Sequence, residues 1–264
     1  MAMLRIERDA RGIATLTLDR PEARNALSAA LVTRLTESLE ALAGDATVRA
    51  VLMTGSAGVF CAGADIGEMR AAGKASQEQN EADARRFAKM LEVLERQPQP
   101  TLALVNGAAY GGAVGLIAAC DIALAAKSAR FALSEVRLGL LPAMISPYVI
   151  RAMGPRQARR WFLTGEAMEA QAAERIGLVH EVVDDAALPA ASAALVDALL
   201  AGGPGAQAEI KRLIRHVTGR SEPADESMLA ETARWIARIR AGDEAREGLT
   251  AFLERRKPGW IRNA

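Results

Sequence analysis

Cysteine and histidine are scarce in this chain of 264 residues, with two of each. Cys61 and Cys120 do not form a CxxC pair, and His180 and His216 have no metal-ligand spacing to each other or to the cysteines. A disulfide framework and a zinc site are therefore not expected. We interpret both thiols as small buried hydrophobic groups and expect no metal at the functional site.

An excess of charge of one sign is also lacking. The 33 lysines and arginines nearly balance 32 acidic residues, which leaves a formal net charge of +1 and excludes the basic footprint of nucleic-acid-binding proteins. No apolar secretory segment opens the chain, and no apolar run is long enough to span a bilayer. These absences predict a cytoplasmic protein whose partners include neither nucleic acid nor a membrane.

Three common catalytic or nucleotide-binding motifs are missing. The glycine-rich segment 111–115 (GGAVG) does not follow G-x-G-x-x-G, and the chain has no G-x-x-x-x-G-K-S/T loop. Neither Ser56 nor Ser134 stands in a G-x-S-x-G turn. Nucleotide binding of these kinds and an α/β-hydrolase triad are therefore unsupported.

What the chain does contain is an alternation of short apolar runs with helical stretches. Ser28 is a predicted cap for a helix that places Leu31, Leu35, Leu39 and Leu42 on one face. The predicted strands are 13–18, 48–54, 101–105, 122–125 and 178–183. Two of these strands, 101–105 and 122–125, are apolar on both faces, which predicts helices packed over a sheet and an α/β fold class.

The other segments set the predicted organisation. Residues 70–97 are polar and predict a loop around Gly73 followed by a helix ending near Arg96. The loop either covers an acyl pocket or is a solvated connection. The chain is predicted to be almost entirely helical after residue 183. The expected helices are 186–201, 205–218, 223–241 and 243–256. We predict a core over 1–195 and a helical region over 196–264.

Two glycine-punctuated segments, 61–69 (CAGADIGEM) and 105–115 (VNGAAYGGAVG), each follow an apolar run, and Glu135 lies further along in 131–139 (FALSEVRLG). Small residues let two backbone N–H groups approach one oxygen, and a helix starting near Gly112 would add its dipole. Such turns also serve packing alone, and a lone glutamate is often a cap or a solvated charge. The order and flanks of the two segments favour an oxyanion site, and the apolar neighbours of Glu135 favour a raised pKa.

These segments together resemble the enoyl-CoA hydratase/isomerase (crotonase) superfamily, and the resemblance runs from 20–27 (RPEARNAL) to 255–257 (RRK). It implies an α/β crotonase (ClpP-like) fold of repeated ββα units, with a C-terminal helical region that forms homotrimers, which can pair as homohexamers. It also implies that water adds to a 2-enoyl-CoA thioester through an enolate. Coenzyme A then enters as part of the acyl-CoA substrate, and no other cofactor is expected.

The resemblance assigns roles to particular residues. The backbone N–H groups of Ala64 and Gly112 are the implied oxyanion donors, and Glu135 is the implied acid and base. Lys257 either meets a coenzyme A phosphate or belongs to a solvated basic face. The remaining residues on the substrate and coenzyme A side are Ala23, Arg24, Ala62, Asp65, Ile66, Gly67 and Gly111.

The chain departs from the best-known hydratases at Gly115, where their second glutamate would fall. Glu135 alone, another group or water must then supply the second proton. The run 131–142 followed by 145–148 (ISPY) is most similar to bacterial 3-methylglutaconyl-CoA hydratase-like members, whose substrate carries a free carboxylate. Arg137, two residues from Glu135, is a candidate for that carboxylate, although alternation along a strand would put both side chains on one face. The alternative is that Arg137 forms a surface or inter-subunit salt bridge. Ser146 and Tyr148 are further candidates.

Two other functions remain open at this point. An enoyl-CoA isomerase, or another reaction of the family, would use the same oxyanion site. A non-catalytic acyl-CoA-binding protein would explain the missing second glutamate as lost chemistry.

Overall fold

A computed structural model describes residues 3–72, 74–219, 226–240 and 242–261 of the chain. Its internal contacts separate two units, Met1–Ala194 and Leu195–Ala264. The first unit holds both sheets, and the second is helical.

The larger sheet of the first unit has the strand order β1-β2-β3-β5-β7-β10 within the described residues. Its strands are β1 (Leu4–Arg8), β2 (Ile13–Leu18), β3 (Ala50–Gly55), β5 (Thr101–Val105), β7 (Ile122–Ala126) and β10 (Glu181–Val183). The β1–β2 pair is antiparallel and every other pair is parallel. The five predicted strands are confirmed, although the last is shorter than 178–183, and β1 was not predicted.

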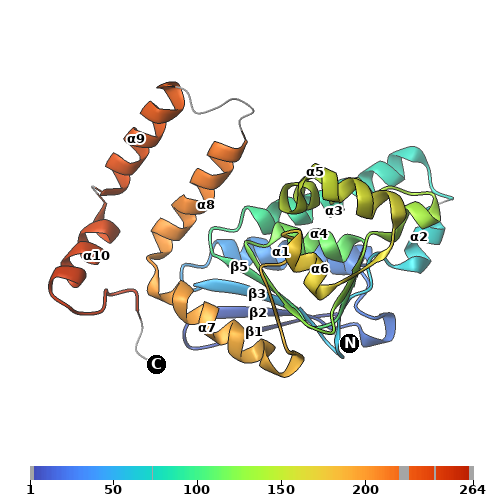
Figure 1. The fold of residues 1–264 in the computed structure, drawn as a ribbon, viewed down its shortest axis with the longest axis horizontal. Helices are drawn as coiled ribbons and strands as arrows, with labels where there is room; N and C mark the ends of the chain where they lie inside the picture. Colours follow the sequence, from blue (N-terminus) through green and yellow to red (C-terminus); the bar gives the residue numbers. More distant parts are fainter. Residues whose placement is uncertain (1–2, 73, 220–225, 241, 262–264) are drawn as a thin grey trace. The chain divides into compact units, whose positions relative to one another are not determined.

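Helices cover this sheet because its inner strands, such as β3 and β5, are apolar and buried on both faces. The helix α1 (Ala29–Ala43) starts where Ser28 Oγ accepts the N–H of Leu31 at 3.3 Å. It packs against α3 (Gln77–Glu95), whose N-terminus is closed by a capping box between Ser76 and Gln79. Figure 1 shows α3, α4 and α5 grouped on one side of the sheet. The predicted α/β fold class is confirmed.

A second, smaller sheet was not predicted. Its order is β4-β6-β8-β9 among the described residues. The strands are β4 (Val59–Cys61), β6 (Ala108–Tyr110), β8 (Arg130–Ala132) and β9 (Ala167–Glu169). The first three pair in parallel, and β9 is antiparallel to β8. Strands of three residues are too short to show an alternation of apolar and polar residues, so this sheet could not be predicted from the sequence pattern.

The remaining helices of the first unit connect these strands. They are α2 (Ile66–Ala72), α4 (Gly112–Ala119), α5 (Ser146–Thr164) and α6 (Ala170–Arg175), with short 3-10 helices at Pro21–Ala23, Ser134–Leu138 and Asp185–Ala187. The predicted helix start at Gly112 is confirmed, and α3 ends one residue before Arg96. Part of the predicted loop is wrong, because α2 already begins at Ile66; Gly73 lies outside the described residues.

The C-terminal helices are α7 (Leu188–Ala201), α8 (Pro204–Thr218), α9 (Glu226–Arg240) and α10 (Asp243–Leu253). The four predicted helices are therefore confirmed, except that the start of the predicted 223–241 helix lies outside the described residues. No single helix in the described ranges is long and apolar enough to cross a membrane. The segments Asp185–Ala201 and Pro204–Thr218 meet that length and composition only when taken together as a bent pair.

Candidate active site

The three predicted site segments leave neighbouring strands of the small sheet at the same edge. Cys61 on β4 pairs with Ala109 on β6, and Tyr110 pairs with Ala132 on β8. Because these strands are parallel, their carboxyl ends lie together. The first glycine segment leaves β4 there, the second leaves β6, and Glu135 follows the end of β8. The carboxyl ends of parallel strands are where α/β proteins commonly bind ligands.

The two glycine turns are in backbone contact. Gly63 has a φ of +94°, and a Cβ built on it would lie 2.7 Å from the carbonyl oxygen of Tyr110 and 3.9 Å from the Cα of Gly111. Neither the conformation nor the space admits a side chain at this position. The absence of a side chain at Gly63 therefore brings together two segments that are far apart in the chain.

The backbone N–H of Ala64 is free because the parallel β-bridge between Ala64 and Leu27 uses the residues on either side of Ala64. Leu27 donates its N–H to the carbonyl of Gly63 at 2.7 Å and accepts the N–H of Asp65 at 3.2 Å. In such a parallel bridge the middle residue, Ala64, directs its own N–H away from the partner. Within the described residues this N–H has no acceptor.

The first turn of α4 offers a second free amide. Gly111 precedes the helix and brings no capping side chain; its own N–H donates to the carbonyl of Ala132 at 2.8 Å. The next amide, that of Gly112, has no acceptor in the part of the chain that the structure describes. Since α4 is apolar and nearly all buried, the positive end of its dipole is poorly screened by water.

Glu135 lies directly beside this helix start. Gly111 has a φ of +51°, and a Cβ on it would lie 3.1 Å from Oε1 of Glu135. The other carboxyl oxygen, Oε2, is buried and has no hydrogen-bond partner among the described residues. Burial raises the pKa of the Glu135 carboxyl above its ordinary value, and a hydrogen bond from its own backbone opposes this in part. The arrangement places an ionisable carboxyl beside the helix start where the amide of Gly112 is free.

An apolar wall closes the site next to Gly112. A Cβ on that glycine would lie 2.9 Å from Cζ of Phe87 on α3 and 3.2 Å from Cδ1 of Leu27. Low-dielectric surroundings strengthen hydrogen bonds to a developing negative charge. Sequence reasoning missed Phe87, although it is the one aromatic residue in the polar stretch 70–97.

The loop before α1 joins the first glycine turn. Ala62 donates its N–H to the carbonyl of Arg24 at 3.0 Å, and Ala23 donates to the carbonyl of Arg20 at the same distance. The buried side chain of Asn25 donates to the carbonyl of Val59 at 2.7 Å. Two left-handed residues in succession, Arg24 and Asn25, make this loop tight enough to lie against β4. The structure thus brings Ala23, Arg24 and Ala62 together.

Asp65 has a defined structural partner. Its Oδ2 accepts from the guanidinium of Arg20 at 3.1 Å, and its Oδ1 accepts the N–H of Gly67 at 3.0 Å at the start of α2. The hydrogen bond from Arg20 lowers the pKa of Asp65. Ile66 follows in the first turn of α2 and is 82% exposed. Sequence reasoning had not assigned Arg20 a role, because its contacts depend on the folded loop.

The strand geometry expected for Arg137 is wrong. Ser134–Leu138 is a 3-10 helix, in which residues two apart point to different sides. The exposed side chain of Arg137 lies beside Gly165, with Nε 3.2 Å from a Cβ built there. The hydrogen bond from Arg160 lowers the pKa of the neighbouring Glu166, and the positive charge of Arg137 adds to this effect. Of the weaker candidates, Ser146 donates its hydroxyl to the carbonyl of Ala143 at 2.8 Å, and Tyr148 is half-buried.

Lys257 belongs to the C-terminal unit. It follows α10 and is exposed, and its carbonyl accepts a hydrogen bond from the guanidinium of Arg256 at 3.2 Å. Arg256 is itself bound to Glu247 at 2.6 Å. The contact of Lys257 with a phosphate stays a prediction.

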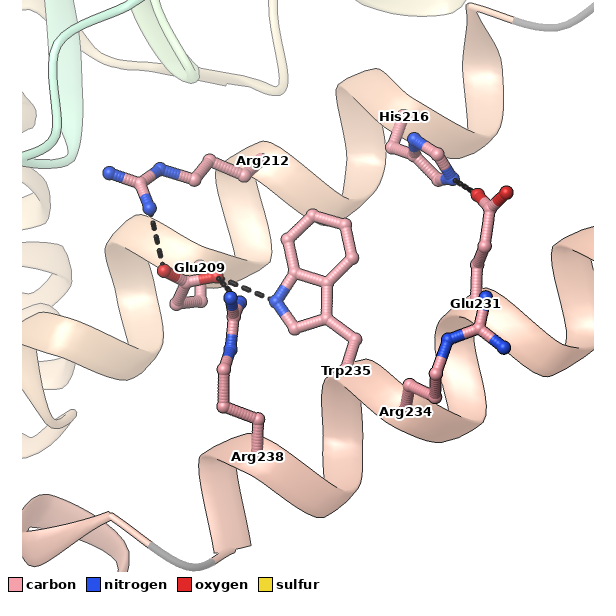
Figure 2. Close-up of a pocket in the computed structure, with 7 residues that line it drawn as sticks. All are labelled: Glu209, Arg212, His216, Glu231, Arg234, Trp235 and Arg238. Atoms are coloured by element: carbon pink, nitrogen blue, oxygen red, sulfur yellow. Dashed lines mark hydrogen bonds and ion pairs between the residues drawn. The ribbon is translucent and has the colours of Figure 1, made fainter.

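A pocket of about 470 Å³ lies between α8 and α9 of the C-terminal unit. Figure 2 shows Glu209 held by Arg212 at 2.7 Å, Arg238 at 3.2 Å and the indole nitrogen of Trp235 at 2.6 Å. These contacts occupy Glu209 in a polar network that joins the two helices. No group of three or more histidine, cysteine or acidic side chains able to hold a metal is found within the described ranges.

Known proteins that are similar to this chain are named as enoyl-CoA hydratases. The family model for enoyl-CoA hydratase/isomerase matches residues 8–263. A crystal structure of an enoyl-CoA hydratase from Shewanella pealeana matches with a TM-score of 0.94 and 42% identity, over 98% of this chain and 96% of that chain. A probable enoyl-CoA hydratase from Rhodobacter capsulatus is 36% identical over 94% of this chain and 93% of its own length. The 2,3-dehydroadipyl-CoA hydratase of Escherichia coli K12 is 34% identical over 98% of both.

The chain belongs to the enoyl-CoA hydratase/isomerase family, and the crotonase fold predicted from the sequence is confirmed.

Proposed function

We propose that this enzyme adds water across the double bond of a 2-enoyl-CoA thioester, with Glu135 as its acid and base. The amides of Ala64 and Gly112 bind the thioester oxygen in this proposal. The observation that carries it is the contact of the two glycine turns through Gly63, with the carboxyl of Glu135 against Gly111. The names of its relatives support the same reaction class.

The two amides act on the charge that builds during the reaction. When water attacks the β-carbon, the electrons of the double bond move toward the thioester oxygen, which becomes an enolate oxygen. Two donors already in place stabilise this charge without reorganisation, and each contributes about 10²–10³ in rate. The dipole of α4 and the apolar wall of Phe87 and Leu27 add to this effect.

Glu135 supplies the proton transfer. As a carboxylate it removes a proton from the attacking water, and burial makes it a stronger base than an exposed glutamate because its pKa is raised. Proton transfer by a positioned side chain contributes about 10²–10⁴ in rate. Coenzyme A enters only as part of the substrate, so this mechanism requires no other cofactor.

The proposed substrate carries a second, free carboxylate, as 3-methylglutaconyl-CoA does. Two observations support this. The E. coli relative is named for a coenzyme A ester of a dicarboxylic acid, and Arg137 is exposed two residues from Glu135, where its charge also acts on Glu166. Arginine binds carboxylates well because its planar fork donates two parallel hydrogen bonds.

We also propose that the C-terminal helices assemble the enzyme into trimers, which can pair as hexamers, in the cytoplasm. Exposed apolar residues on these helices support the assembly. On α8, Ile210, Ile214 and Val217 recur at one-face spacing, and on α10 the exposed apolar residues are Leu249, Phe252 and Leu253. Light scattering of the purified protein measures the subunit number, and a monomer at assay concentrations would contradict this proposal.

The test is a side-by-side turnover assay with crotonyl-CoA and 3-methylglutaconyl-CoA, followed by the loss of the conjugated-thioester absorbance. Glu135→Gln is expected to lower kcat by about 10²–10⁴ while leaving the affinity for a saturated acyl-CoA unchanged. Glu40→Gln, on the exposed face of α1, is the matched control and should behave as wild type.

Three outcomes would contradict the proposal. Wild-type turnover by Glu135→Gln would remove Glu135 from the mechanism. Conversion of a 3-enoyl-CoA to the 2-enoyl form without uptake of water, in a protein inactive in hydration, would identify an isomerase. Acyl-CoA binding without turnover of any enoyl substrate would identify a binding protein.

A further inference from the structure

Gly115 lies one helical turn after Gly112 on α4, so the two positions share a face of the helix. A Cβ built on Gly115 would lie 2.2 Å from Cγ2 of Ile145 and 2.8 Å from its Cβ. Both residues are buried, and Ile145 is only 3% exposed. The side chain of Ile145 therefore occupies the place where any side chain at position 115 would begin.

Ile145 has no easy way to leave this place. It immediately precedes α5, and its carbonyl accepts the N–H groups of Tyr148 at 3.1 Å and Val149 at 3.0 Å. Rotating its side chain would move Cγ2 but not Cβ, which by itself is too close for a neighbouring Cβ. A larger residue at position 115 thus requires the start of α5 to shift, not only a change of rotamer.

The side chains nearest to the three glycines of the α4 start include one that can carry a proton. Glu135 lies against Gly111, Phe87 and Leu27 lie against Gly112, and Ile145 lies against Gly115. Of these four side chains, only that of Glu135 ionises.

We propose that Ile145 and Gly115 form a size-matched pair that excludes a second acid, so that the carboxyl of Glu135 alone performs both proton transfers of the hydration. This inference rests on the proposed hydratase function. Ile145 is then a specificity-determining residue, because it fixes a one-carboxyl site and presents an apolar surface in place of a second charge.

The single-carboxyl reaction balances. The Glu135 carboxylate takes one proton from water as the water oxygen bonds to the β-carbon. The electron pair of the double bond forms the enolate, whose oxygen lies between the amides of Ala64 and Gly112. The protonated Glu135 then gives its proton to the α-carbon, which restores the thioester carbonyl and the carboxylate. The hydroxyl and the hydrogen are added from the same side of the substrate.

The first experiment measures exchange of the α-protons of butyryl-CoA with D₂O by mass spectrometry, beside hydration of the enoyl-CoA that wild type turns over best. In a one-carboxyl site Glu135→Gln loses both activities together, each by at least about 10². Hydration lost with α-proton exchange retained would reveal a second proton-transfer group and overturn the inference. A wild-type protein that hydrates no enoyl-CoA would instead contradict the proposed function.

The second experiment tests the size match by a mutant series. Gly115→Glu alone is expected to lower the melting temperature and to abolish hydration of crotonyl-CoA. Adding Ile145→Gly removes both close contacts and should restore the melting temperature toward that of Ile145→Gly alone, with crotonyl-CoA hydration rising at least about tenfold above Gly115→Glu. Ile145→Val is the matched control, because it keeps Cγ2 and Cβ and should rescue nothing.

Equal rescue by valine and glycine, or a stable and active Gly115→Glu single variant, would refute the size match. If the double variant does not fold, α-proton exchange by Glu135→Gln still tests the inference, because retained exchange would reveal a second proton-transfer group and overturn it.

Discussion

Replacing Gly63 with alanine tests the backbone contact on which the proposed oxyanion site depends. Gly63 has a φ of +94°. An alanine in such a left-handed conformation lowers the free energy of unfolding by about 1–2 kcal/mol at any position. The specific cost is steric: the new Cβ would lie 2.7 Å from the carbonyl oxygen of Tyr110, whereas real Cβ contacts begin near 3.0 Å and become comfortable at 3.4 Å. The two turns must therefore separate by about 0.3–0.7 Å, and the amides of Ala64 and Gly112 separate with them.

The size of the expected effect follows from that displacement. A misplacement of 1 Å at an active site costs about 10²-fold in rate, so a shift of about 0.3–0.7 Å predicts a fall in kcat of about 4- to 25-fold. The assay is steady-state hydration of an enoyl-CoA, together with a melting curve. We expect KM to change less than kcat, because the amides act mainly on the charge of the transition state.

Gly58 provides the matched control, at the opposite end of β4. It also has a positive φ, +70°, but a Cβ there meets no heavy atom within 4 Å. Gly58→Ala should therefore show the loss of stability without the loss of kcat. Equal kcat values for the two variants would refute the reasoning that backbone contact at Gly63 sets the oxyanion site.

Two further predictions concern charged side chains. Because burial raises the pKa of Glu135, its ionised form destabilises the fold. Glu135→Gln should therefore have a higher melting temperature than wild type once the pH exceeds the raised pKa. This difference in melting temperature should vanish below pH 4.5, the ordinary pKa of a glutamate. A constant difference in melting temperature across that range would contradict the assigned burial. Arg137→Met should raise KM for 3-methylglutaconyl-CoA about tenfold and leave KM for crotonyl-CoA unchanged, since only the first carries a free carboxylate; parallel changes in both would exclude Arg137 as its partner.

Patterns that persist over a whole element could be predicted from the sequence. The leucines of α1 recur with the helical period behind a capping serine, Ser28, and β5 is apolar on both faces, so both elements were identified. The glycine turns were identified because small residues there serve an approach of backbone to backbone, and Gly63 and Gly111 have the positive φ values such turns need.

What the sequence could not predict depends on contacts between distant segments. The strands β4, β6 and β8 have three residues each and form only because they pair with one another. Strand alternation was the wrong guide to the direction of Arg137, because local spacing does not distinguish an extended segment from a 3-10 helix. The filling of the space at Gly115 by Ile145 joins residues thirty positions apart, and nothing local at either position indicates it.

The first turn of α4 has no side-chain cap, and this limits how the fold can be stabilised by engineering. A helix whose first turn is closed by a side-chain cap gains about 1 kcal/mol, yet α4 begins with two glycines and no cap. Evolution for heat resistance would find gains at many surface positions, but a hydrogen bond supplied to the Gly112 amide would compete with the substrate for it. A thermostabilised variant must therefore leave the amide of Gly112 uncapped, although a cap there would stabilise the helix.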